Sequence, residues 1–225
     1  MPSNWPSICT AIIPCLNEAA TIRSVVEEVR KLLPTVIVID DGSTDDTGKL
    51  AAEAGALVLR HDQPRGKGAA LASGWRHAVS LGFQWALTLD GDGQHSPADI
   101  PSFLARAETS GAGLVVGDRM ANPKGMPWMR RQVNRWMSRQ LTRLAGCTLS
   151  DTQCGFRLMN LTAWSKMQIE TNHFEAESEL LLAFAAAGQN IEFVPIAVIY
   201  QDEESKIRPL ADTWRWFRWL LRRKV

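Results

Sequence analysis

The chain has 225 residues, 45% of them hydrophobic and 22% charged, and its formal net charge is +1. It is long enough for one large domain with a real core, and its composition is that of an ordinary globular protein. The balanced charge argues against general nucleic-acid binding. The basic stretches 119–143 and 215–224 instead favour a site for phosphates or an anionic surface.

None of the four cysteines belongs to a CxxC pair or a zinc-ligand set, so we expect free thiols in a reducing compartment. The N-terminal segment has no secretory pattern, and no window reaches the roughly 18–20 uninterrupted apolar residues that a membrane span needs. We therefore expect a cytoplasmic protein, soluble or peripherally associated with the cytoplasmic membrane face.

The first half of the chain alternates short β-prone runs with helical stretches. The expected strands are Ile8–Ile13, which Pro14 should end, Val36–Ile39, Ala56–Leu59 and Trp85–Leu89. The expected helices are Glu18–Leu33, Ser43 to about Ala54, and Gly66–Leu81. This alternation predicts an α/β fold, with a mostly parallel sheet of right-handed βαβ units and helices on both faces.

After Val116 the alternation becomes less regular. The expected elements are a basic helix at Pro127–Leu144, an irregular strand at Asp151–Met159, a helix at His173–Ala187, a strand at Ile191–Ile199, a polar segment at Gln201–Arg208 and a C-terminal helix at Asp212–Lys224. No repeat or linker divides the chain. We expect one domain over residues 1–208 and an amphipathic helix within 209–225, as part of that domain or as an appendage.

Polar motifs follow three of the expected strands. They are Pro14-Cys15-Leu16-Asn17-Glu18, Asp40-Asp41-Gly42-Ser43 and Asp90-Gly91-Asp92. In an open α/β sheet the ligand site lies beyond the carboxyl ends of the strands. All three motifs should therefore converge on one edge of the sheet.

Asp90 and Asp92 are spaced so that both can project to the same side of a strand end. Two such carboxylates can bind one Mg²⁺ or Mn²⁺, and Gly91 and Gly93 would let the backbone turn close to a ligand. The alternative is an acidic surface turn, because Asp and Gly are common in loops. The apolar strand before the pair favours the metal site.

Asp41 has two interpretations of equal weight. It accepts hydrogen bonds from a base or ribose, or else Asp40 or Asp41 caps the helix that begins near Ser43. The stretch Arg65–Gly68 could bring backbone N–H groups and two cations to phosphates at a helix start. It is neither a P-loop nor a GxGxxG fingerprint, which argues against ATP hydrolysis and nicotinamide chemistry.

The order of these motifs carries a resemblance. Together with Ile12-Ile13 before the first motif and Gly155-Phe156-Arg157 after the last, they resemble family 2 glycosyltransferases of the GT-A fold. Within that family, the chain from about Ile8 to Arg218 is most similar to polyprenyl-phosphate (dolichyl-phosphate) mannose or glucose synthases. The resemblance implies metal-dependent, inverting transfer of a hexose from a GDP-mannose- or UDP-glucose-type donor to a polyprenyl phosphate at a membrane surface. It implies no nucleic-acid partner and leaves room for a separate membrane-protein partner.

The resemblance also implies roles for single residues. The nucleotide-binding residues would be Pro14, Leu16, Glu18, Ile39, Asp41 and Lys67, with Lys67 facing the phosphates. The metal ligands would be Asp90, Asp92 and Gln94, and the phosphate of the acceptor or product would bind Arg119 and Arg130. Leu16 stands where the family often has Tyr, a change that could weaken a stacking or polar contact.

The acceptor has two alternatives. A lipid monophosphate is already largely ionised near neutral pH, so it can displace the nucleotide directly and with inversion, with little help from a base. A hydroxyl acceptor, as in glycan or glycolipid assembly, needs a base, and Asp151 is then the first candidate. Asp151 could instead be a turn residue paired with Arg157. A non-catalytic binding domain is a third possibility, which the intact set of candidate metal ligands disfavours.

Several features of the second half keep two interpretations. Arg135, Arg139 and Arg143 favour a solvated helix face over a phosphate site. Glu175 and Glu179 are spaced to lie on one exposed helix face or near the site, and Glu177 could orient an arginine.

Two further features concern the end of the chain. The segment Tyr200–Arg208 lacks an arginine that mannose synthases often carry before a Ser-Lys pair, and Lys206 and Arg208 are candidate substitutes. The donor sugar therefore stays open. The mixed aromatic and basic tail, Trp214–Lys224, favours contact with a bilayer interface over packing onto the domain.

Overall fold

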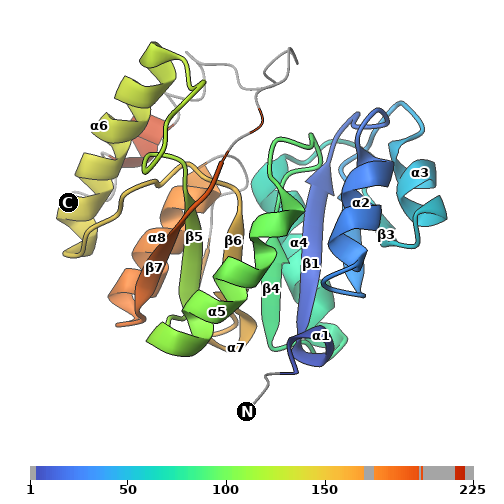
Figure 1. The fold of residues 1–225 in the computed structure, drawn as a ribbon, viewed down its shortest axis with the longest axis horizontal. Coiled ribbons are helices and arrows are strands. Elements are labelled where there is room, and N and C mark those ends of the chain that lie inside the picture. The colour runs from blue at the N-terminus through green and yellow to red at the C-terminus, as the bar shows by residue number, and fades with distance from the viewer. Residues whose placement is uncertain (1–3, 170–174, 198, 200–215, 221–225) are drawn as a thin grey trace.

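A computed structural model describes residues 4–169, 175–197, 199 and 216–220 (Figure 1). Seven strands form one sheet in the order β3-β2-β1-β4-β6-β5-β7. The strands are β1 Cys9–Cys15, β2 Val36–Asp40, β3 Leu57–Arg60, β4 Trp85–Thr88, β5 Leu114–Asp118, β6 Arg157–Asn160 and β7 Ile191–Pro195. Only β6 runs antiparallel to its neighbours in this sheet. The predicted α/β fold with a mostly parallel sheet is confirmed.

Helices connect the strands and cover the sheet. They are α1 Trp5–Ile8, α2 Ile22–Arg30, α3 Thr47–Glu53, α4 Lys67–Ser80, the 3₁₀ turn η1 Pro97–Asp99, α5 Ile100–Ser110, α6 Trp128–Ala145, α7 Leu161–Trp164 and α8 Glu175–Ala186. In Figure 1, α2 and α5 lie in front of the sheet and α4 and α8 lie behind it. The sheet is therefore buried between two helical layers, as parallel sheets generally are.

The core follows from the apolar pattern of the first half. Every residue of β2 is buried, and the stripe Ile22, Val25, Val26 and Val29 is the buried face of α2. Gly74 lets α4 approach the sheet closely, because a Cβ there would lie 2.6 Å from Cγ2 of Ile12 and 3.0 Å from Cδ1 of Ile39. Close helix-on-sheet packing thus fixes where the N-terminus of α4 lies relative to the ends of β1 and β2.

Some expected boundaries were wrong. Strand β1 does not stop at Pro14 but continues to Cys15. The fixed φ of proline is compatible with an extended strand, and proline lacks only one N–H donor. Helix α2 begins at Ile22, because Glu18–Thr21 forms a turn in which the Glu18 carbonyl accepts from Thr21 and Ile22. Helix α3 begins at Thr47, because the preceding residues form turns in which the Ser43 N–H donates to Asp40 and the Thr44 N–H donates to Asn17.

The C-terminal helix packs onto the domain where it is described. Residues 216–220 are helical, and Trp216, Trp219 and Leu220 are buried. Trp216 donates from Nε1 to Ser178 Oγ at 2.9 Å and lies edge-on to Trp136. For these side chains, packing onto the domain replaces the expected contact with a bilayer. Within the ranges described, no helix is long and apolar enough to cross a membrane.

Candidate active site

Hydrogen bonds join the three polar motifs at the carboxyl ends of β1, β2 and β4, at the top of Figure 1. The Asn17 N–H donates to Ser43 Oγ at 3.0 Å, and the Glu18 N–H donates to Thr47 Oγ1 at 2.8 Å. Thr21 Oγ1 donates to the Gly91 carbonyl at 2.6 Å. The predicted convergence of these motifs on one edge of the sheet is confirmed.

The Asp90–Asp92 loop lies directly against the end of β1. A Cβ on Gly91 would lie 2.5 Å from Cys15 Sγ and 3.5 Å from Glu18 Cγ, so only glycine fits this approach. Glu18, which is half-buried, therefore lies beside the two aspartates. Pro14 and Leu16 are also half-buried near this end of β1.

Lys67 and Asp90 form the charged centre of this edge. Lys67 is the first residue of α4, and its Nζ lies 2.7 Å from Asp90 Oδ1 and 2.9 Å from Glu177 Oε1. Burial alone would raise the pKa of Asp90, but the charge and hydrogen bond of Lys67 lower that pKa to about 2. Burial opposes the charge on Lys67, but its two carboxylate partners raise the pKa of Lys67 overall. Both groups are ionised at neutral pH.

Gly155 closes over this ion pair. A Cβ at Gly155 would lie 2.9 Å from both Asp90 Oδ2 and Lys67 Nζ. The backbone between Asp151 and β6 therefore passes within contact distance of the carboxylate. This cradle would be filled by any side chain, which explains the glycine before Phe156.

Asp92 differs from Asp90 because none of the described residues forms an ion pair with it. Its Oδ1 accepts from the Gln94 N–H at 3.0 Å, while burial and the charge of Asp90 raise the pKa of Asp92. His95 Nδ1 accepts from the Asp90 N–H at 3.3 Å, and burial lowers the pKa of His95. The site thus holds two carboxylates that repel each other, beside a neutral histidine.

This donor set fits a hard divalent cation. Asp90, Asp92 and Gln94 offer only oxygen ligands, and Mg²⁺ is usually bound by one or two carboxylates together with water and substrate phosphates. In the part of the chain that the structure describes, no group of three or more His, Cys, Asp or Glu residues gathers as a cage. An ion bound by these three side chains would complete its coordination with water or substrate oxygens.

Asp40 and Asp41 are both buried and have separate partners. Asp40 accepts from the Ser43 N–H at 2.8 Å and pairs with Arg60 Nη1 at 2.7 Å. Because α3 begins only at Thr47, with no side-chain cap, this bond closes a turn, and the alternative that Asp40 or Asp41 caps the helix is wrong. Asp41 Oδ1 lies 2.6 Å from His61 Nδ1, and the Asp41 carboxylate accepts from the N–H groups of Arg65 and Gly66 at 3.0 and 2.8 Å.

Asp41 thereby positions the loop that leads to Lys67. Its expected contact with a base or ribose stays a prediction. Ile39, the other residue expected to flank the base, has a fully buried side chain beneath α4. Ile39 therefore belongs to the core in this structure, and its expected contact with the base stays a prediction.

A second charged cluster joins the end of β5 to α6. Arg119 Nε and Nη2 donate to Asp151 Oδ2 and Oδ1 at 2.7 and 2.8 Å, and Asn134 Nδ2 donates to the same carboxylate at 2.8 Å. Burial would raise the pKa of Asp151, but the hydrogen bonds and charge of Arg119 hold that pKa below its ordinary value. Arg130, half-buried, lies one turn before Asn134 on the same face of α6.

One alternative for this cluster was wrong. Asp151 pairs with Arg119 and not with Arg157, which is buried and donates to the carbonyls of Cys154, Thr152 and Glu177. With both oxygens of its carboxylate accepting hydrogen bonds, Asp151 is poorly placed to act as a base.

Helix α8 also differs from expectation. Glu175, Glu177 and Glu179 are all buried, so Glu175 and Glu179 do not lie on an exposed face. The Glu177 carbonyl holds Arg157, while its carboxylate binds Lys67. Acids two residues apart on a helix cannot share one exposed face, and that spacing was the available signal for burial. The Tyr200–Arg208 segment lies outside the described residues.

Comparisons with known proteins agree with this geometry. The model of the family "Glycosyl transferase family 2" matches residues 10–167. The UDP-N-acetylglucosamine--dolichyl-phosphate N-acetylglucosaminyltransferase of Methanococcus voltae is 31% identical over 214 residues, covering 85% of each chain. The undecaprenyl-phosphate mannosyltransferase of Micrococcus luteus is 29% identical and covers 87% of this chain and 86% of its own. Glucosyl-3-phosphoglycerate synthase from Mycobacterium tuberculosis, in complex with UDP, superposes with a TM-score of 0.75 at 25% identity, covering 96% of this chain and 79% of its own.

Proposed function

Because the chain belongs to glycosyltransferase family 2, we propose that it transfers a hexose from a nucleotide-diphosphate sugar to a polyprenyl phosphate with inversion at the anomeric carbon. The chain is a glycosyltransferase with the GT-A type of fold. The donor class is supported by the fold relative in complex with UDP. The acceptor class is supported by the names of two relatives, which act on dolichyl and undecaprenyl phosphate.

The donor diphosphate would bind at the Asp90–Asp92 edge. Asp90, Asp92 and Gln94 would hold Mg²⁺ or Mn²⁺, which neutralises charge that develops on the leaving diphosphate. Lys67 is held at the start of α4 by Asp90 and Glu177, and it stays protonated at neutral pH. Its ammonium group can therefore stabilise the same leaving group without a proton transfer.

The main support for a phosphate acceptor is that Asp151 is already hydrogen-bonded and ionised. A hydroxyl acceptor needs a base, and the candidate base is buried, bound by Arg119 and Asn134, and has a lowered pKa. A phosphate acceptor is already anionic and needs no base. In this proposal Arg119 and Arg130 bind that phosphate. Glycan or glycolipid assembly on a hydroxyl acceptor is the second candidate.

A transfer assay tests the acceptor. The protein would be incubated with Mn²⁺, a radiolabelled GDP-mannose or UDP-glucose, and a short-chain polyprenyl phosphate, with the matching polyprenol as control acceptor. We expect a lipid product only with the phosphate, and mild acid should release the sugar because the product is a sugar phosphodiester. An acid-stable product from the polyprenol would favour the hydroxyl alternative.

The donor is tested separately. A thermal-shift series with GDP, UDP and other nucleoside diphosphates in Mn²⁺ should show one preferred base, since a ligand of the native state raises Tm by mass action. A GDP preference would favour mannose, and a UDP preference would favour glucose or a related sugar. The named relatives use different sugars, so their likeness does not choose between these donors.

A further inference from the structure

From the exposed side of α6 we infer that this helix is a docking surface for an anionic lipid bilayer. We call this surface the α6 face. It consists of the exposed apolar residues Trp128, Met129, Val133 and Trp136 and of the arginine row Arg135, Arg139 and Arg143. The inference extends the proposed function, because a polyprenyl phosphate lies in a bilayer. Its test needs no acceptor, so the two proposals can fail separately.

Most of the apolar surface of the α6 face does not pack into the core, although Trp136 also contacts Trp216. Trp128 and Met129 are 67% and 68% exposed, and Val133 and Trp136 are 40% and 41% exposed. The buried side of the same helix is made by Asn134, Met137, Ser138 and Leu141. Tryptophan on the outer surface of a helix suits the headgroup depth of a bilayer, because its ring can contact the apolar acyl region while its N–H stays in the polar headgroup region.

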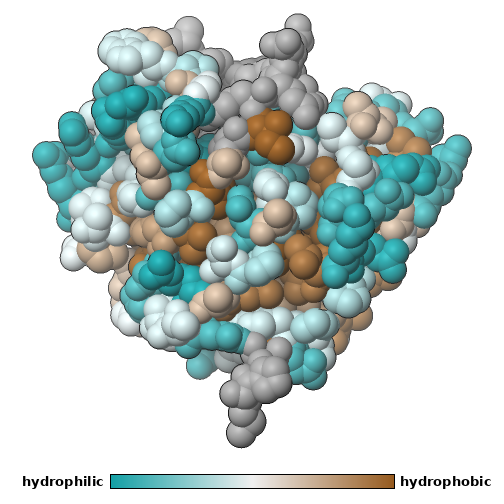
Figure 2. All heavy atoms as spheres, viewed as in Figure 1, coloured by the Kyte–Doolittle hydropathy of each residue, from teal (hydrophilic) through white to brown (hydrophobic). Residues whose placement is uncertain are grey.

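The charge of α6 indicates which kind of partner surface would bind it. Its 18 residues include five arginines and no acid. Within the described ranges, none of these arginines takes part in an ion pair. On the face shown in Figure 2, strongly hydrophilic side chains gather over α6. A row of free cations beside exposed tryptophan is complementary to anionic lipid headgroups, each basic residue adding to the attraction.

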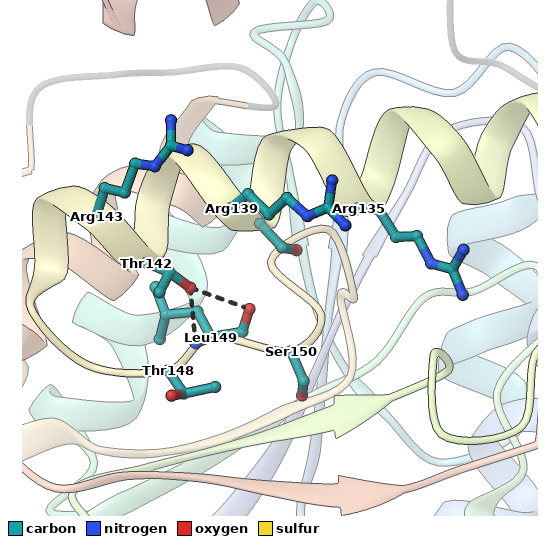
Figure 3. Close-up of a pocket in the computed structure, with 8 residues that line it drawn as sticks. Arg135, Arg139, Thr142, Arg143, Thr148, Leu149 and Ser150 are labelled. Atoms are coloured by element: carbon teal, nitrogen blue, oxygen red, sulfur yellow. Dashed lines mark hydrogen bonds between the residues drawn. The ribbon is translucent and has the colours of Figure 1, made fainter.

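A hollow of about 400 Å³ lies along the arginine row (Figure 3). Arg135, Arg139 and Arg143 line it from α6, and Thr148, Leu149 and Ser150 line it from the following loop. Thr142 fixes that loop, because its Oγ1 accepts from the Leu149 N–H at 3.0 Å. Guanidinium groups and hydroxyls are donors for a phosphate. The hollow therefore offers a place for a lipid headgroup while the tryptophans enter the interface.

The position of α6 connects docking to the site. Its N-terminal end lies on the same side of the molecule as the carboxyl ends of the parallel strands (Figure 1). Asn134, on the second turn, binds Asp151, which in turn holds Arg119. A bilayer on the α6 face would thus lie about one helix diameter from the arginines that the proposed function gives to the acceptor phosphate, which are on the opposite side of α6.

Vesicle co-sedimentation tests the inference. The full chain would be mixed with phosphatidylcholine vesicles containing either no phosphatidylglycerol or about one third of it, all without polyprenyl phosphate. We expect binding to the anionic vesicles that weakens with salt and little binding to the neutral ones. The double variant Trp128→Ser, Met129→Ser and the triple variant Arg135→Glu, Arg139→Glu, Arg143→Glu should each lower the partition coefficient at least about tenfold.

Matched controls lie at the end of α4. The double variant Val79→Ser, Leu81→Ser removes two apolar side chains that are 41% and 48% exposed, and Arg76→Glu reverses an exposed charge on the same helix. These controls should bind like the wild type. Circular dichroism and nucleotide binding should be unchanged in all variants, which separates lost docking from lost folding.

Three outcomes would overturn the inference. The first is a wild-type chain that does not bind anionic vesicles. The second is binding that the α6 variants leave unchanged, which would place the contact elsewhere, for example in the tail. The third is a dimer, detected by sedimentation without lipid, that Trp128→Ser, Met129→Ser dissociates, because the α6 face would then bind a second copy of the chain.

Discussion

Two buried carboxylate clusters lie at the same edge of the sheet and are held in different ways. Asp40 and Asp41 bind backbone N–H groups of Ser43, Arg65 and Gly66, all within 25 residues along the chain. Arg60, the cationic partner of Asp40, has a side chain that is 57% exposed.

Asp151 depends instead on side chains from two other elements. Arg119, whose side chain is 10% exposed, follows β5, and Asn134 lies on α6. On the proposed donor side, Asp40 and Asp41 are therefore held by local turns, whereas on the proposed acceptor side Asp151 is held by side chains from distant elements. Substituting one partner should disturb only nearby residues on the donor side, but should disturb the packing of several elements on the acceptor side.

The largest expected effect is on the acceptor side. Arg119→Leu leaves the buried Asp151 carboxylate without its bidentate partner, and breaking a buried pair costs about 3–5 kcal/mol of unfolding free energy. The matched change Arg60→Leu removes a mostly exposed cation, so we expect a cost within about 1 kcal/mol. Urea unfolding of both variants measures the difference. Equal costs would contradict the comparison.

The stability contributed by Asp151 should depend on pH in a direction that its pKa sets. The pKa of Asp151 is lower in the folded protein than its ordinary value, so its carboxylate stabilises the fold above the unfolded-state pKa and loses that contribution as pH falls through the folded-state pKa. Asp151→Asn should therefore be clearly less stable than wild type at pH 7, and the gap should shrink below about pH 4. A gap that stays constant to pH 3 would show that charge is not the cause.

The next effect falls on the donor side and concerns activity. Asp92→Asn removes one proposed metal ligand, and turnover should fall about 10²–10³-fold even in saturating Mn²⁺. Stability should be unchanged or slightly higher, because burial and the repulsion from Asp90 already raise the pKa of Asp92. Asp62→Asn, at an exposed position after β3, is the control. Full transfer by Asp92→Asn would remove Asp92 from the metal site.

The two regions also differ in what could be predicted from sequence. The alternation of strands and helices predicted the parallel half of the sheet, and the rule for strand ends predicted that Asp41, Asp90 and Glu18 would meet. Such local patterns repeat along the chain, so periodicity reveals them.

The periodicity of a sequence does not show which distant side chains will pair. The pairing of Asp151 with Arg119, and not with nearby Arg157, depends on how β5, α6 and the loop before β6 pack together. The contact between Lys67 and Glu177 depends likewise on how α8 lies behind α4. The antiparallel direction of β6 was not predicted, because the residue pattern of a short strand does not indicate whether it runs parallel or antiparallel to its neighbours.

Two glycines that pack against aspartates allow a direct comparison, with a smaller expected effect on stability. Gly155→Ala would place a Cβ 2.9 Å from Asp90 Oδ2 and Lys67 Nζ, and Gly48→Ala would place one 2.7 Å from Asp40 Oδ2. Both should cost about 1–3 kcal/mol of stability, as overpacking does. Only Gly155→Ala should also weaken binding of a nucleoside diphosphate with Mn²⁺, about tenfold, which calorimetry can measure. Equal loss of binding in both variants would show that Gly155 has no special relation to the site.

The smallest effect concerns Leu16, half-buried after β1, where the family often has Tyr. If this position faces the base, Leu16→Tyr should tighten binding of the preferred nucleotide, because an aromatic contact contributes about 0.5–1.5 kcal/mol. Leu16→Phe separates the causes: an equal gain points to stacking, and a gain with Tyr alone points to a hydroxyl contact. Titration calorimetry at one Mn²⁺ concentration measures both. If neither variant changes Kd by twofold, Leu16 does not contact the base, and its half-buried side chain only packs the end of β1.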